Sequence, residues 1–103
     1  MLRWISNPKE WPFGATPEPG RLYFACQVWC EECEENGGII PGHAGCGGFP
    51  LHRLEKALGP IGGRVELDPL LFEYRWEVLI SLPEAWVGRE VYFLLEERVW
   101  EAR

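Results

Sequence analysis

The chain has 103 residues, of which 47% are hydrophobic and 25% are charged. This length and composition fit one small domain over residues 1–103 with a packed core and exclude a disordered chain. The net charge of −6 argues against a binder of nucleic acid or of anionic membranes, because such binders rely on clustered Lys and Arg. The sequence has neither a membrane-length apolar run nor a signal-peptide layout. We therefore expect a soluble, cytoplasmic protein.

The first half of the chain is predicted to hold one strand and one helix around a cysteine-bearing loop. Residues 6–20 are rich in proline, which fixes φ and removes a backbone donor, so we expect an irregular segment. Apolar residues alternate over Leu22–Cys30, a pattern typical of a strand. Residues 30–48 are predicted to form the loop, and their many glycines predict that no helix forms from residue 34 onward. Residues 50–58 carry leucines at helical spacing before a Gly-Pro pair, which predicts a short helix.

The second half of the chain is predicted to be β-structure. Val65–Leu67 favours a short strand. Phe72–Leu82 alternates, with Leu79 as the one exception, between an apolar face and a face of charged and polar residues that we expect to be exposed to solvent. Glu90–Trp100 is predicted to be the returning strand. The expected architecture is α+β, mainly an antiparallel β-sheet with one short helix.

The polar composition is unusual. A single Asp stands among 16 acidic residues, and the chain has nine Pro but few Ser, Thr, Asn or Gln, as is typical of thermophilic proteins. Six Trp are present, and we expect most of them to stabilise the core, although exposed rings would offer a surface to a partner.

The cysteines and histidines gather in one segment. Cys30 and Cys33 form a C-x2-C pair, and His43 and Cys46 form an H-x2-C pair. Two residues between ligands allow a tight turn to aim both side chains at one ion, so two such turns predict a tetrahedral metal site. The sequence indicates structural zinc, with iron as the alternative metal.

The second pair, with its following glycine, resembles the zinc knuckle of zinc-ribbon and treble-clef proteins, which implies a structural zinc. Cys33 is followed by Glu34 rather than by the glycine of that family. Either Cys26 or His52 could replace His43 as the fourth ligand. Cys26 lies on the apolar face of its strand, however, so it is also a candidate core residue. Disulfides and unlinked thiols remain alternatives to a metal.

Two catalytic motifs overlap these cysteines. The sequence Trp29-Cys30-Glu31-Glu32-Cys33 is similar to the W-C-x-x-C of thioredoxin-like oxidoreductases, which implies redox chemistry at Cys30 and Cys33. In that family a long helix begins at the motif and activates a thiolate, whereas here glycines follow and glutamates raise the thiol pKa. The spacing of Cys26, Cys30 and Cys33 resembles the C-x3-C-x2-C of radical S-adenosylmethionine enzymes, whose large barrel this chain is too short to form.

Residues 80–97 resemble the β-turn-β stretch of AbrB-like DNA-binding proteins, which implies a swapped hairpin, but the net charge opposes DNA binding. The interpretation that we favour is a zinc-binding module that is not an enzyme and that binds or regulates a protein, most simply a basic one. A thiol–disulfide oxidoreductase and a structural subunit are the alternatives. The oligomeric state does not follow from the sequence.

Overall fold

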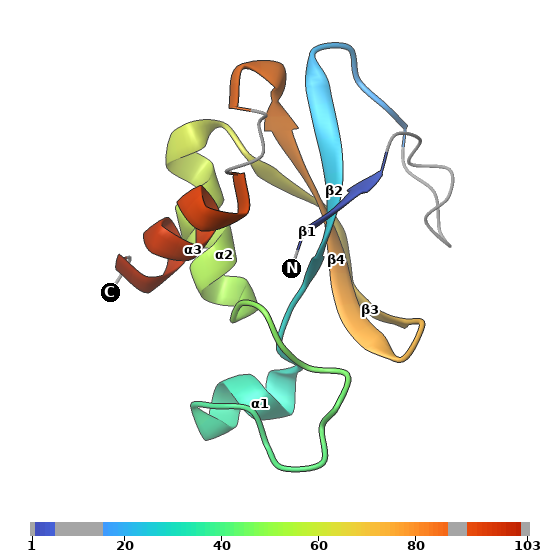
Figure 1. Ribbon diagram of the computed structural model, residues 1–103, viewed down its shortest axis with the longest axis vertical. Coiled ribbons are helices and arrows are strands. Elements are labelled where there is room, and N and C mark those ends of the chain that lie inside the picture. The colour runs from blue at the N-terminus through green and yellow to red at the C-terminus, as the bar shows by residue number, and fades with distance from the viewer. Residues whose placement is uncertain (1, 6–15, 87–90, 102–103) are drawn as a thin grey trace.

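The computed structural model describes residues 2–5, 16–86 and 91–101. Its centre is a four-stranded antiparallel sheet with the strand order β1-β2-β4-β3 (Figure 1). The strands are β1 (Leu2–Ile5), β2 (Arg21–Gln27), β3 (Arg64–Phe72) and β4 (Arg75–Pro83). The helices are α1 (Glu31–Asn36), α2 (Leu51–Leu58) and α3 (Val91–Glu101), with 3-10 turns at Gly59–Ile61 and Glu84–Trp86. The predicted α+β class is confirmed, but the described residues form three α-helices rather than one.

Helices α2 and α3 pack side by side against one face of the sheet, and α1 lies apart from them with the cysteine loop (Figure 1). The predicted helix over residues 50–58 is confirmed as α2, whose Leu54, Ala57 and Leu58 are buried. These residues share a core with alternate residues of the two central strands, among them Phe24, Cys26, Val78, Ile80 and Leu82. Burial of this apolar face accounts for the position of both helices. None of the helices in the described ranges is long and apolar enough to cross a membrane.

Strand β4 is buried on both faces, so the predicted solvent-facing side is wrong. Glu77 and Ser81 are only 2% and 0% exposed. The guanidinium of Arg3 on β1 donates two hydrogen bonds to the Glu77 carboxylate at 2.7 and 2.8 Å, which compensates the buried charge. Arg21 donates to the Ser81 hydroxyl, which in turn donates to Glu66. Partners on the other three strands of the sheet thus satisfy the polar residues of β4.

The strand predicted to begin at Phe72 is interrupted. Phe72 ends β3, and Glu73 and Tyr74 form the turn before β4 with positive φ angles of 49° and 66°. Such a two-residue turn is normally built from Gly or Asn. Since neither residue is present, the sequence carries no turn signal at this position. The short strand predicted at Val65–Leu67 is correspondingly the start of the longer β3.

The predicted return strand over Glu90–Trp100 is wrong, because Val91–Glu101 form helix α3. Val91, Leu95 and Val99 are its buried residues, and a spacing of four fits a helix as well as an alternating strand. Phe93, which the strand pattern placed in the core, is 66% exposed. The second strand of the AbrB-like hairpin is therefore absent from the described residues.

The tryptophans do not fill the core as expected. Within the described ranges, Trp4, Trp86 and Trp100 are exposed, while Trp29 and Trp76 are half-buried. In the proline-rich stretch predicted over residues 6–20, residues 6–15 lie outside the described residues, and residues 16–20 contain neither helix nor strand.

Candidate metal centre

The chain between β2 and α2 holds all four residues of the two predicted ligand pairs. Cys30 is the N-cap residue of α1, and Cys33 is the buried residue of that helix. His43 and Cys46 follow in the loop that leads to α2. One pair is therefore held by a helix and the other by a loop.

Helix α1 corrects the prediction that residues 30–48 form a loop without helix. Glutamate has a high helix propensity, and in the first turn its negative charge interacts favourably with the positive end of the helix dipole. The helix ends at Gly37, which has a positive φ of 79° and donates its amide to the carbonyl of Glu34. The amide of Gly38 donates to the carbonyl of Cys33, so glycine ends the helix after six residues.

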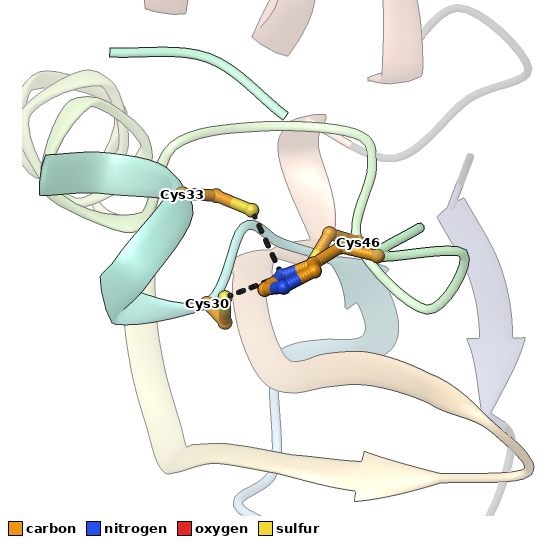
Figure 2. Close-up of side chains that lie close together, drawn as sticks. Cys30, Cys33 and Cys46 are labelled. Atoms are coloured by element: carbon orange, nitrogen blue, oxygen red, sulfur yellow. Dashed lines mark hydrogen bonds between the residues drawn. The ribbon is translucent and has the colours of Figure 1, made fainter. Parts of the chain in front are cut away.

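The four side chains converge (Figure 2). Their ligand atoms all lie within 4.8 Å of one another: the sulfurs of Cys30, Cys33 and Cys46 and a ring nitrogen of His43. The Nδ1 atom of His43 lies 3.5 Å from the Cys30 sulfur and 3.4 Å from the Cys33 sulfur. Two ligands of a tetrahedral zinc ion, with bonds of about 2.3 Å to sulfur and about 2.0 Å to nitrogen, lie about 3.6 Å apart. The group thus has the donors and the spacing of a zinc site.

Backbone hydrogen bonds shape the loop around the sulfurs. The amide of Ile40 donates to the sulfur of Cys33 at 3.4 Å. The amide of His43 donates to the carbonyl of Ile40, and the amide of Cys46 donates to the carbonyl of His43. This last bond closes the tight turn that the H-x2-C spacing predicts.

The thiols have unequal pKa values. A hydrogen bond from the backbone of Cys33 and contact with His43 lower the pKa of the Cys30 thiol to about 7, against the effect of desolvation. Desolvation raises the pKa of the Cys46 thiol to about 11. All four cysteines are free thiols, the form from which thiolate ligands arise.

The loop is also attached to the sheet. The carbonyl of Gly45 accepts hydrogen bonds from the amide of Trp76 at 2.8 Å and from the side-chain amide of Gln27 at 3.1 Å. Further along, Phe49 donates to the carbonyl of Gln27, and its own carbonyl accepts from Trp29. The end of the loop therefore continues the hydrogen bonding of β2 and β4.

The two substitute ligands lie elsewhere. Cys26 is 1% exposed in the core shared by the sheet and the helices, and burial raises the pKa of its thiol to about 12. His52 is exposed on α2, and its Nδ1 atom lies 3.3 Å from a carboxylate oxygen of Glu34. The structure brings neither residue into the group of four.

Sequence reasoning placed Glu32 near the cysteines, but it missed the position of this residue beside His43 and the residues that hold the loop. The Nε2 atom of His43, on the side of the ring away from the sulfurs, lies 3.9 Å from a carboxylate oxygen of Glu32. This distance is too long for a hydrogen bond, so the Glu32 carboxylate lies beside the imidazole without fixing its orientation. The hydrogen-bond partners of the loop, Gln27 and Trp76, are far from the cysteines in sequence and carry no motif that marks them.

Comparison of the chain with protein family models, with curated proteins and with solved structures finds no match. Its function has to be inferred from its own residues.

Proposed function

We propose that this protein holds one structural zinc ion through Cys30, Cys33, His43 and Cys46 and acts as a protein-binding module. The observation that carries the proposal is the convergence of three sulfurs and one imidazole nitrogen within 4.8 Å. Thiolate and imidazole are the ligands that zinc prefers, and four of them complete its tetrahedral coordination. A complete ligand set leaves no position for a substrate, which favours a structural over a catalytic role.

Bound zinc supplies a cross-link between two parts of the chain. Cys30 and Cys33 would hold it from α1, while His43 and Cys46 would hold it from the loop that is attached to the sheet. Helix α1 has six residues, of which only Cys33 is buried. Because so short a helix is unstable by itself, the ligands would fix its position.

The net charge of −6 supports a basic protein as the partner. An acidic surface repels phosphate backbones and attracts Lys and Arg side chains. Association with such a partner would become slower as salt screens these charges.

Cobalt substitution tests the proposed centre. Cobalt(II) bound to the metal-free protein should give the intense visible bands of tetrahedral coordination and thiolate-to-metal charge transfer, and one equivalent of zinc should displace it. Cys26→Ala is the matched control and should give the same spectrum, whereas Cys46→Ala should lose it. A spectrum of octahedral cobalt, or an unchanged spectrum in Cys46→Ala, would contradict the assignment.

A thiol–disulfide oxidoreductase is the second candidate, and one observation favours it. Cys30 lies at the start of α1, and the pKa of its thiol is lowered to about 7, as expected for an attacking thiolate. Against it, a cysteine pair that binds metal is not free for disulfide exchange. The metal-loaded protein should therefore not accelerate the reduction of insulin by dithiothreitol. Turnover that is lost in Cys30→Ser would establish the oxidoreductase instead.

A further inference from the structure

Helix α3 carries apolar side chains on two opposite sides. Val91, Leu95 and Val99 are buried against the sheet and α2. The exposed positions of the helix are Phe93, Glu97, Trp100 and Glu101, which lie four, three and one residues apart and therefore share one side. We call these four residues the outer face of α3.

The two rings of the outer face are unusually accessible. Phe93 is 66% exposed and Trp100 is 41% exposed. The Trp100 ring lies 6.5 Å from that of Trp29, the residue before Cys30, and the guanidinium of Arg53 lies 5.4 Å from its centre. These neighbours support one side of the Trp100 ring. A supported, exposed aromatic side chain is the kind of residue that anchors a protein interface.

The two charged residues of the outer face, Glu97 and Glu101, are negative, and the neighbouring cation, Arg53, stacks on the Trp100 ring. Neither Glu97 nor Glu101 forms an ion pair with any residue in the described part of the chain. If two copies paired through this face about a two-fold axis, like charges would meet in the interface. A partner segment with apolar and basic side chains would instead cover the rings and neutralise the carboxylates.

We infer that the outer face of α3 is the docking site for a basic amphipathic segment of another protein. Phe93 and Trp100 supply the apolar contact, and Glu97, which lies between them along the helix, pairs with a Lys or Arg of the partner. The choice of a basic partner rests on the proposed function, and this inference adds the surface that binds that partner. It selects α3 rather than α1, whose exposed residues are glutamates and one asparagine without an exposed apolar side chain.

Titration of the ¹⁵N-labelled, zinc-loaded protein with a synthetic helical peptide of Leu and Lys tests this assignment. The peptide should shift the amides of α3 and the indole N–H of Trp100 in a saturable way, and a matched Leu–Glu peptide should not. Phe93→Ser and Trp100→Ser should each weaken binding about tenfold. Glu97→Gln should weaken it at low salt and much less at high salt.

Matched controls separate α3 from other exposed surfaces. Tyr74→Ser removes an exposed ring from the β3–β4 turn, and the Glu31→Gln, Glu35→Gln double variant removes charge from α1. Both should bind the peptide as the unmodified protein does. Shifts centred on α1, or equal affinity after Phe93→Ser, would overturn the inference. So would a solution dimer that Phe93→Ser dissociates, because the occupant would then be a second copy. Zinc content measured on the same samples shows separately whether the metal centre is present.

Discussion

The carbonyl oxygen of Gly45 accepts a hydrogen bond from the backbone amide of Trp76 at 2.8 Å. This bond joins the residue before Cys46 to strand β4. A Cβ atom added at Gly45 would lie 2.5 Å from the carbonyl oxygen of Tyr74, so only glycine allows this approach. The sheet therefore positions one ligand pair of the candidate metal centre directly.

Gly45→Ala should consequently damage the metal centre without touching a ligand. The loop must move away from Tyr74, and Cys46 moves with it, so we expect weaker zinc binding in a competition titration with a chelator. Gly38→Ala is the matched control, because a Cβ at that position meets no atom within 4 Å. Equal zinc affinity in the two variants would show that the contact between loop and sheet does not position Cys46.

Removal of the metal should loosen the site unevenly. Amide hydrogen exchange after chelation should become fast at Gly37, Gly38 and Ile40, whose bonds depend on α1 and the Cys33 sulfur. The amides of Phe49 and Trp76 should stay protected, because their acceptors are the carbonyls of Gln27 and Gly45. Loss of protection at all five amides would mean that the loop has no attachment to the sheet without metal.

Cys26 should contribute to the stability of the fold at alkaline pH, and it should have no effect on the metal content of the protein. Burial raises the pKa of its thiol from 9.0 to about 12, so between these values the unfolded chain has lost a proton that the folded chain retains. The contribution of this thiol to the free energy of unfolding is therefore complete below pH 9 and falls as the pH rises to 12. The slope of this fall approaches about 1.4 kcal/mol per pH unit.

Cys26→Ala should remove that slope, and the lost packing should cost about 1–2 kcal/mol at pH 7. Urea unfolding of both proteins across the alkaline range measures the difference. An identical pH dependence in the two proteins, or loss of zinc from Cys26→Ala, would contradict the placement of Cys26 in the core.

Arg3→Met should destabilise the sheet by about 1–3 kcal/mol, because it leaves the buried carboxylate of Glu77 with a weaker set of partners. Arg75 remains near Glu77, with its Nε atom 3.5 Å from the carboxylate, which limits the loss. Arg64→Met is the control, since Arg64 is itself exposed and pairs with the exposed Glu18 and the partly exposed Glu66, and such surface pairs contribute about 0–1 kcal/mol. Chemical denaturation of the two variants should separate them, and equal losses would contradict the role assigned to the pair.

The sequence predicted the cluster of three cysteines and one histidine better than the sheet around it. The spacing of Cys30, Cys33, His43 and Cys46 is local chemistry, and it identified the four side chains that the structure brings together. Helix α2 was predictable for a similar reason, because its leucines and its Gly-Pro end lie within one short segment.

The missed features depend on contacts between distant residues or on ambiguous spacing. Val91, Leu95 and Val99 satisfy both a strand and a helix pattern, and only packing against the sheet and α2 distinguishes them. The burial of Glu77 depends on Arg3, which lies 74 residues earlier in the chain. The Glu73–Tyr74 turn has no glycine to mark it, and helix α1 was obscured by the glycines that end it.

The metal content of the protein tests the central claim most directly. Elemental analysis of untagged protein, purified without added metal or chelator, should find close to one zinc per chain, and Cys33→Ala should lose it while Cys26→Ala retains it. Protein without zinc or iron, or with Cys30 oxidised to a disulfide, would contradict the claim that these four residues form a metal centre.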